Sequence, residues 1–293
     1  MRAFAKINLV LRAQSASADG YHALETVFQA LTLHDVVVST PTRGAFVVVC
    51  DDPAVPVDGR NLAWKAARAL WRALGRPGEP AGCTVTIGKQ IPVMGGLGGG
   101  SADAAAALVA LHALWKGRLS PSALAAVAGR IGADVPYFLV GGTAMGLGRG
   151  DDVYPLDDLA KRWVVLACPA FGVPTADAYR WLDEDRAAGR VLASAASTPL
   201  TVWGGRTLEI RNDLQGPVAF RHDEIGQLVT LLHREGAEAA AMSGSGSTVF
   251  GLFTDESRAR RAAHVAAGAG TQVILTRTAT RRWCHRALSG AVS

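Results

Sequence analysis

The chain has 293 residues, of which 49% are hydrophobic and 19% charged, and 33 are glycines. This composition is typical of a folded protein with a substantial buried core, and it excludes a disordered, collagen-like or coiled-coil chain. No apolar run reaches the roughly 18 residues of a membrane span, and the amino-terminal stretch shows no cleavage site, so we expect a cytoplasmic protein with no membrane partner.

The net charge of +5 is unevenly distributed along the chain. Residues 1–150 contain 14 basic and 9 acidic side chains, whereas residues 151–293 contain 16 of each, which favours a site for an anionic ligand in the first half. At about 150 residues per domain the length predicts two domains, and we place the boundary at a break near residue 150. The four cysteines are far apart and predict neither a zinc site nor a disulfide framework.

The first half contains strands, two capped helices and a glycine-rich loop. Residues 3–11 alternate as a strand that places Lys6 and Asn8 on one face. Further strands are predicted at 26–33, 35–40, 45–50 and 83–87, and helices at 61–74, 102–115 and 120–132. Asn61 and Ser120 are placed to cap the first and last of these helices.

The second half is also mixed. It predicts a strand at 163–169, a polar stretch at 183–206, a helix at 223–234, a hairpin at 239–253, a helix at 255–268, a strand at 271–278 and a basic tail. Strands and helices follow each other without a regular βαβ repeat, so the fold class is α+β.

The strongest local signal is the stretch MGGLGGGSADAA at 94–105, which has five glycines within six positions just before a helix. Glycines let the backbone approach a ligand closely, and the N–H groups at a helix start attract anions. Ser101 can cap this helix or offer its hydroxyl to a phosphate or a metal ion. Because neither Walker A nor Rossmann spacing is present, we predict a phosphate-binding loop of a third type rather than a flexible connector.

At this point the sequence resembles the GHMP kinase superfamily and, within it, the family of 4-diphosphocytidyl-2-C-methyl-D-erythritol kinases of the non-mevalonate isoprenoid pathway. The resemblance lies in AKINLVL (5–11), DGYHALETVFQAL (19–31), IPVMGGLGGGSADAA (91–105), GADVPYFL (132–139), GTAMGLGRGD (142–151) and MSGSGSTVF (242–250). It covers about two thirds of the chain and leaves 181–210 unmatched.

The resemblance implies a two-domain GHMP kinase fold. Residues 1–150 would form a nucleotide-binding domain like domain 2 of ribosomal protein S5, and residues 151–293 a ferredoxin-like domain on the substrate side. It also implies that ATP phosphorylates the 2-hydroxyl of 4-diphosphocytidyl-2-C-methyl-D-erythritol, a small cytidine-diphosphate substrate. Mg²⁺ is expected from phosphoryl-transfer chemistry, although no metal-ligand cluster is visible in the sequence.

The catalytic residues implied by the resemblance are Lys6 and Asp134. Asp134 would orient the attacking hydroxyl and accept its proton, and Lys6 would hold that carboxylate ionised and stabilise developing charge. Simpler interpretations stay open, since Asp134 suits a helix N-cap and Lys6 suits an edge strand with its charge in solvent.

The binding residues implied by the resemblance fall into two sets. Those for ATP are Pro92, Val93, Met94, Gly95, Gly96, Leu97, Gly98, Gly99, Gly100, Ser101, Ala102, Asn61 and Lys89. Those for the substrate are Asn8, Tyr21, His22, Tyr179, Ser243, Gly244, Ser245 and Gly246, with Tyr21 and Tyr179 on the two sides of the cytosine ring. Asn61 as a helix cap, Lys89 as a surface lysine and 243–246 as a plain hairpin turn remain alternatives.

Two other functions are compatible with parts of the sequence. A homoserine or mevalonate-type GHMP kinase would share the glycine-rich loop, but Tyr21 and His22 argue against it. The stretch 257–293 contains seven arginines and no acidic residue, which suggests a non-catalytic nucleic-acid-binding protein. This stretch has a single aromatic residue, Trp283, so we do not expect nucleic acid to be the partner.

Overall fold

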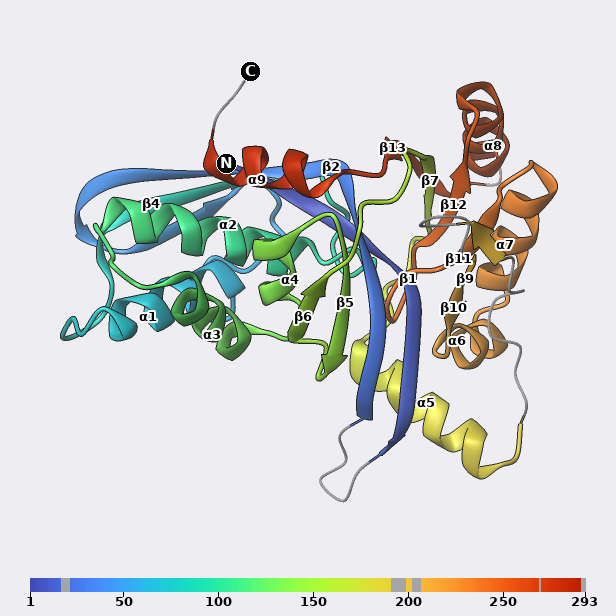
Figure 1. The fold of residues 1–293 in the computed structure, drawn as a ribbon, viewed down its shortest axis with the longest axis horizontal. Coiled ribbons are helices and arrows are strands. Elements are labelled where there is room, and N and C mark those ends of the chain that lie inside the picture. Colours follow the sequence, from blue (N-terminus) through green and yellow to red (C-terminus); the bar gives the residue numbers. More distant parts are fainter. Residues whose placement is uncertain (17–21, 191–198, 202–206, 269, 291–293) are drawn as a thin grey trace.

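The larger of the two main sheets has seven strands, in the order β10–β1–β2–β4–β3, with β5 beside β2 and β6 beside β5 (Figure 1). The computed structural model describes residues 1–16, 22–190, 199–201, 207–268 and 270–290. The strands of this sheet are β1 (Arg2–Ala16), β2 (His22–Ala45), β3 (Val47–Cys50), β4 (Ala81–Gly88), β5 (Thr143–Gly148), β6 (Asp152–Pro155) and β10 (Arg211–Asn212). The α+β class predicted from the sequence is confirmed.

Strand β2 is continuous over 24 residues, so the predicted interruption between 33 and 35 is wrong. His34 pairs with Phe4 and Asp35 with Ala3 in the ladder to β1. Asp35, which is typical of a turn, is fully buried in the strand because the Lys89 ammonium neutralises its carboxylate. The first part of β2 pairs with β5 and the last part with β4, so β2 runs through the whole sheet.

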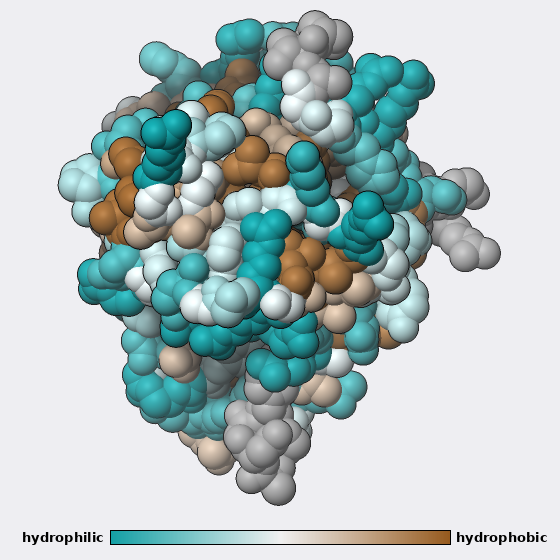
Figure 2. Space-filling model, turned by 90° about the vertical axis from the view of Figure 1, so that its left-hand side faces the viewer, coloured by the Kyte–Doolittle hydropathy of each residue, from teal (hydrophilic) through white to brown (hydrophobic). Residues whose placement is uncertain are grey.

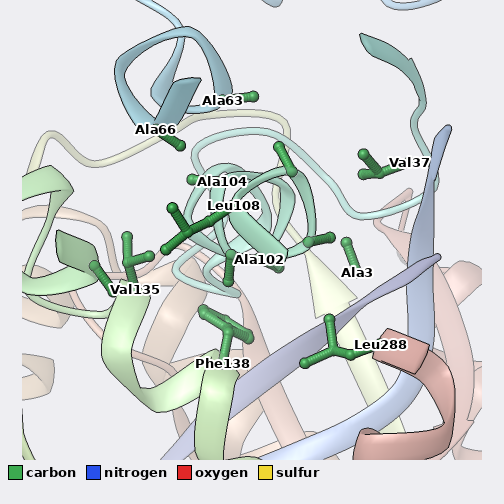
Figure 3. Close-up of a cluster of buried hydrophobic side chains, with 14 of the residues drawn as sticks. Ala3, Val37, Ala63, Ala66, Ala102, Ala104, Leu108, Val135, Phe138 and Leu288 are labelled. Atoms are coloured by element: carbon green, nitrogen blue, oxygen red, sulfur yellow. The ribbon is translucent and has the colours of Figure 1, made fainter. Parts of the chain in front are cut away.

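Helices α1 (Leu62–Ala73), α2 (Gly99–Leu114) and α4 (Val135–Val140) pack on this sheet, and α3 (Pro121–Ile131) packs on α1 and α4. Asn61 and Ser120 cap α1 and α3 through their side chains, as predicted. Helix α2 lies at the centre, and its alanines let neighbouring elements approach closely. Figure 3 shows Ala102, Ala104 and Leu108 of α2 surrounded by side chains from β1, β2, α1, α4 and the last helix, α9 (Arg281–Ser289).

The second sheet is antiparallel, in the order β11–β12–β7–β13. Its strands are β7 (Trp163–Cys168), β11 (Ala239–Met242), β12 (Val249–Phe253) and β13 (Gln272–Arg277). Taken in chain order this is the strand order of a ferredoxin-like βαββαβ unit, and α7 (Glu224–Arg234) and α8 (Glu256–Gly268) cover one face. Helices α5 (Thr175–Ala187) and α6 (Gln215–Arg221) and the small hairpin of β8 (Pro199–Thr201) and β9 (Thr207–Glu209) complete this part.

The two sheets are joined by a shared hydrophobic cluster. Ala5, Ile7 and Leu9 of β1 pack with Leu166 of β7 and Phe250 of β12, and all five side chains are fully buried. Strand β1 is therefore buried on both faces, which explains why the polar side chains of Lys6 and Asn8 within it are also inaccessible to bulk solvent.

The chain crosses back to the first sheet twice after residue 150. Strand β10 pairs with β1, and α9 packs against α4 and β1 (Figure 1). The predicted boundary at residue 150 lies two residues before β6, which is still a strand of the first sheet. The basic tail is not a loose extension, because Cys284, Ala287 and Leu288 of α9 are buried.

The outer surface at the α1–α3 end of the molecule carries scattered hydrophobic patches separated by hydrophilic side chains (Figure 2). Among the described residues, no helix is both long and apolar enough to cross a membrane.

Candidate active site

The glycine loop, residues 92–100, is held in its shape by glycines that no larger residue could replace without strain. Gly96 and Gly98 have φ angles of +75° and +74°, in the left-handed region. A Cβ atom added at Gly96 would lie 2.1 Å from the carbonyl oxygen of Ser243, and one added at Gly98 would lie 2.8 Å from the Phe138 ring. The loop therefore packs directly on residues 243–246, which we call the serine turn.

Helix α2 begins at Gly99, and Gly98 is its N-cap. The prediction that Ser101 caps this helix is wrong, because Gly98 in the left-handed conformation ends the loop three residues earlier. In the described part of the chain no side chain caps the N-terminus of α2, so its first N–H groups are available to an anion. Ser101 lies in the first turn instead.

A cavity of about 440 Å³, the loop cavity, lies along the glycine loop and the start of α2. It brings together most of the predicted ATP-binding residues: Asn61, Lys89, Pro92, Val93, Met94, Gly95, Gly96, Leu97, Gly98, Gly99, Gly100 and Ser101. Ala102 is not among the residues that line it. Its side chain is only 1% exposed and points into the hydrophobic cluster around α2, where a methyl group fits the packing (Figure 3).

The Asn61 side chain makes two hydrogen bonds. Its side-chain oxygen accepts a hydrogen bond from the Ala63 N–H at 2.8 Å, and its amide donates to the Pro56 carbonyl at 2.7 Å. The alternative that Asn61 caps a helix is therefore confirmed, and the residue also lines the loop cavity.

Lys89 lies between two buried carboxylates at the edge of the loop cavity and is not a solvated surface lysine. Its ammonium donates to Asp35 and, at 2.9 Å, to Asp103 of α2. Asp35 also accepts hydrogen bonds from the N–H groups of Gln90 and Ile91, at 2.5 and 2.8 Å. This triad fixes the segment that enters the glycine loop.

The pKa values of Asp103 and Lys89 are both raised, for different reasons. Burial raises the pKa of Asp103 to about 7, against the lowering effect of Lys89. Burial works to lower the pKa of Lys89, but Asp103 and Asp35 outweigh it and raise that pKa above its ordinary value. One oxygen of Asp103 has no hydrogen-bond partner in the described structure.

Lys6 of β1 and Asp134, directly before α4, come together, with the Lys6 nitrogen 3.5 Å from a carboxylate oxygen of Asp134. Asp134 precedes α4 in the N-cap position, but its side chain makes no capping hydrogen bond. Its carboxylate is 35% exposed, whereas the Lys6 side chain is only 4% exposed. The carboxylate is therefore accessible to a ligand, and Lys6 supplies a fixed positive charge beside it.

Asn8 orients Lys6 through a buried chain of hydrogen bonds. The Lys6 ammonium donates to the Asn8 side-chain oxygen at 2.6 Å, the Asn8 amide donates to the Thr26 hydroxyl at 2.8 Å, and this hydroxyl donates to the Val10 carbonyl at 2.7 Å. The predicted shared face of Lys6 and Asn8 is confirmed. The Phe28 ring, with its centroid 5.8 Å from the ammonium, gives a cation–π contact.

A second cavity of about 300 Å³, the lysine cavity, is lined by Lys6, Asn8 and Asp134. Met94, Gly96, Gly98 and Thr175 line both this cavity and the loop cavity, so the two meet at the glycine loop. Gly244 and Ser245 of the serine turn and Tyr179 of α5 form other parts of the wall.

The serine turn is tied to the glycine loop on one side and to β1 on the other. The Ser243 hydroxyl donates to the Gly96 carbonyl at 3.0 Å and accepts from the Asn8 N–H at 3.4 Å. Asn212 of β10 donates to the carbonyls of Met242 and Gly244, both at 2.8 Å. The turn is thus part of the wall of the lysine cavity and more than a plain hairpin connection.

Of the three predicted base-recognition residues, Tyr179 lines the lysine cavity, His22 lies against Tyr179, and Tyr21 lies outside the described residues. The rings of His22 and Tyr179 stack on each other, with centroids 5.0 Å apart. The two His22 ring nitrogens contact the Gln14 carbonyl at 2.7 Å and Asp183 at 3.1 Å. Tyr179 lines the cavity, whereas His22 lies behind it.

Several residues of the site were missed by the sequence reasoning. Thr26, Phe28 and Thr175 contact or line the lysine cavity. Asp35 and Asp103 hold Lys89, and their signal was visible as acidic residues in otherwise apolar segments. The described residues contain no group of three or more His, Cys, Asp or Glu side chains that would hold a metal ion.

Comparisons with known proteins agree with this geometry. The family model for the GHMP kinases N terminal domain matches residues 61–142, and the model for the GHMP kinases C terminal matches residues 203–271. The chain is 37% identical to the 4-diphosphocytidyl-2-C-methyl-D-erythritol kinase of Moorella thermoacetica over 290 residues, covering 94% of this chain and 97% of the relative. It is 44% identical to the relative of the same name from Anaeromyxobacter dehalogenans, covering 94% and 90%.

The fold is likewise shared with solved structures. A crystal structure of 4-(cytidine 5'-diphospho)-2C-methyl-D-erythritol kinase superposes with a TM-score of 0.73 at 32% identity, over 95% of this chain and 98% of that one. The mevalonate kinase of Methanococcus jannaschii superposes with a TM-score of 0.66 at 13% identity, over 96% and 98%, which shows a likeness of fold alone.

Proposed function

The chain belongs to the GHMP kinases, within the 4-diphosphocytidyl-2-C-methyl-D-erythritol kinases, and on this premise we propose that it phosphorylates the 2-hydroxyl of 4-diphosphocytidyl-2-C-methyl-D-erythritol with ATP. This reaction belongs to the non-mevalonate route to isoprenoid precursors. The main support from the structure is the meeting of the two cavities at the glycine loop, beside the Lys6–Asp134 pair.

The nucleotide would occupy the loop cavity. Its phosphates would accept hydrogen bonds from the N–H groups of the glycine loop and of the first turn of α2, where the helix dipole also favours negative charge. Asn61 and Lys89 line the same cavity; the Lys89 ammonium lies beside Gly99 at the start of α2, whereas Asn61 would lie near the base. The positive φ angles of Gly96 and Gly98 suit this close approach of backbone to phosphate.

The acceptor would occupy the lysine cavity, with its hydroxyl against Asp134. The Asp134 carboxylate would orient this hydroxyl and accept its proton while the oxygen attacks the terminal phosphorus in line with the leaving ADP. Lys6, held by Asn8, would stabilise negative charge on the attacking and transferred oxygens. Burial of Lys6 strengthens this effect because few waters screen it.

The cytidine end would extend toward Tyr179, whose ring faces the cavity from α5. An aromatic ring stacks on a base at the cost of little conformational freedom. Tyr21 is proposed for the opposite side of the base. For His22 we propose a supporting role, since its ring already stacks on Tyr179 and contacts Gln14 and Asp183.

Mg²⁺ is proposed as a cofactor, and the residues present fit it. This ion is typically held by one or two protein oxygens together with substrate phosphates, so a large ligand cluster is not required. The Ser101 hydroxyl in the first turn of α2 is the side-chain oxygen that we assign to it. When bound, Mg²⁺ neutralises phosphate charge.

The four cysteines are all free, which fits a reducing compartment. We therefore propose that the protein is located in the cytoplasm.

Replacing the Asp134 carboxylate tests the proposal. Asp134→Asn keeps the shape of the side chain but cannot accept a proton, so kcat should fall at least about 100-fold. The control is Asp223→Asn, a change at an exposed residue of the second domain that should leave kcat unchanged. Wild-type turnover in Asp134→Asn would refute the assignment of the base.

The acceptor is tested separately by supplying 4-diphosphocytidyl-2-C-methyl-D-erythritol, mevalonate and homoserine in the same ADP-release assay. Turnover with the cytidine substrate alone is expected. Equal turnover with mevalonate or homoserine would refute the proposed specificity, and retention on RNA at physiological salt would favour the nucleic-acid alternative.

A further inference from the structure

One face of the first sheet is covered by α2, and the opposite face is covered only in part, by α9 (Figure 1). Phe4 and His34 are neighbours in the ladder between β1 and β2, and both rings contact the Trp283 ring of α9, with centroids 6.4 and 6.0 Å apart. The same face continues beside α9 across the later part of β2, β4 and β3. We call this uncovered region the open face.

The centre of the open face is uncharged and largely apolar. Its side chains come from three neighbouring strands: Val36, Val38 and Thr40 of β2, Thr84 and Thr86 of β4, and Val47 and Val49 of β3. Thr86 pairs with Val38 on one side and with Val49 on the other, so the rows are continuous across the three strands. The four valines are between 40% and 48% exposed, and a contiguous exposed patch of this kind is typical of an interaction surface.

Opposite charges lie at the two ends of one row of the open face. Arg2 of β1 pairs with Val36, and Val36 pairs with Gly88 of β4. Asp51 directly follows β3, and a Cβ atom added at Gly88 would lie 3.6 Å from one of its carboxylate oxygens and 3.9 Å from the Val36 Cβ. Among the described residues, neither Arg2 nor Asp51 forms an ion pair. The row therefore runs from a positive charge through an apolar centre to a negative charge.

We propose that the open face binds the open face of a second copy of this chain and forms a two-fold dimer of stacked sheets. A two-fold axis that runs along the strands, between the two sheets, places Arg2 of each copy opposite Asp51 of the other. It also places Val36 opposite Gly88, which has no side chain to obstruct it. A second copy fits because the row carries both signs of charge and its centre carries none, so no like charges meet across the axis.

Helix α9 does not prevent this contact. Stacked sheets lie about 10 Å apart, which is close to the roughly 10 Å diameter of a helix, so α9 occupies the same layer as the side chains between the two sheets. The dimer would therefore complete the layer that α9 covers only in part.

Two substitutions on the open face test the contact. Val38→Lys and Val49→Lys each place a charge in the uncharged centre, and each occurs twice in a two-fold interface, so the dissociation constant of the dimer should rise at least about 30-fold. The matched control is Val265→Lys, at a valine of α8 that is 39% exposed and lies outside the open face, and it should leave the dissociation constant unchanged. All three positions are exposed, so urea unfolding should show that each variant is folded.

The measurement is sedimentation equilibrium of the purified full chain over a range of about 1 to 100 μM, which covers the affinities of modest interfaces. With increasing concentration the wild type should approach twice the 30.5 kDa mass of one chain. Val38→Lys and Val49→Lys should stay close to the mass of one chain, and Val265→Lys should follow the wild type.

Exchange of the two charges tests the arrangement of the copies. Arg2→Asp and Asp51→Arg each place like charges opposite each other, so each should raise the dissociation constant about tenfold. The double variant restores opposite charges and should return the dissociation constant close to that of the wild type. A substitution that only damaged the fold would not be rescued by the second one.

A wild-type chain that keeps the mass of one copy over the whole concentration range would overturn the proposal. Co-sedimentation of that monomer with phosphatidylcholine vesicles would then assign the open face to a lipid surface instead. A dimer that neither valine substitution weakens would also overturn the proposal, because a different surface would hold the copies together. If the double charge exchange fails to restore association, the proposed two-fold arrangement is refuted.

Discussion

Substituting Gly96 by alanine tests whether the glycine loop and the serine turn form one rigid unit. The added Cβ would lie 2.1 Å from the Ser243 carbonyl oxygen, a backbone atom that cannot rotate away. An ordinary C···O contact is about 3.3 Å, so the loop and the turn must separate by about 1 Å. This movement would also break the hydrogen bond from the Ser243 hydroxyl to the Gly96 carbonyl, which is 3.0 Å long.

The substitution should lower both the stability of the protein and its kcat. Alanine at φ +75° costs about 1 to 2 kcal/mol of backbone strain, and the lost hydrogen bond about 1 kcal/mol more, so unfolding in urea should show a loss of about 2 to 3 kcal/mol. A displacement of about 1 Å at the junction of the two cavities should lower kcat about 100-fold.

Gly75→Ala separates the effect of backbone strain from that of the steric clash. Gly75 has a φ angle of +69°, and a Cβ added there would meet nothing within 4 Å. This control carries the backbone strain without the steric clash, so it should lose about 1 to 2 kcal/mol of stability and no activity. If Gly96→Ala retains wild-type kcat, or is no less stable than Gly75→Ala, the rigid packing of loop on turn is refuted.

Two further predictions concern Asp103 and Tyr179. Since an unfolded aspartate titrates near 3.9 and burial raises the pKa of Asp103 to about 7, the folded protein retains a proton that the unfolded chain loses. The free energy of unfolding should therefore fall by about 2 to 4 kcal/mol between pH 4 and pH 7. Asp103→Asn should remove this pH dependence when unfolding in urea is measured across the same range. If the free energies of unfolding of the variant and the wild type change with pH in parallel, the prediction is contradicted. Tyr179→Ala should raise KM for the cytidine substrate about tenfold through lost stacking and leave KM for ATP unchanged, so equal effects on both would argue against a base-stacking role.

The sequence predicted that Lys6 and Asp134 lie close together, because a lysine that holds a carboxylate ionised must be near it. Lys6 and Asp134 are 128 positions apart in the chain, yet both lie in recognisable motifs, and the structure places them 3.5 Å apart. The strand face shared by Lys6 and Asn8 followed from simple alternation.

Features set by tertiary contacts were harder to predict. Asp35 suggested a break in β2, because an unpaired carboxylate would not be buried in a strand. Its partner Lys89 lies 54 residues away in the sequence, so the pairing could not be recognised locally. Helix α2 begins at Gly99 in spite of the low helix propensity of glycine, because the space beside that residue is taken by Ile91 and Lys89. The helix in the basic tail had a detectable signal in the spacing of Cys284, Ala287 and Leu288, which the abundant arginines obscured.

The return of α9 to the first domain has a consequence for shortened variants of the protein. Cys284 and Leu288 belong to the same buried cluster as Phe138, on the helix that follows Asp134. A variant that ends before α9 would lack this part of the packing behind Asp134, although it would keep all the motifs of the first domain. Truncations that remove α9 but spare every motif should therefore give inactive enzyme.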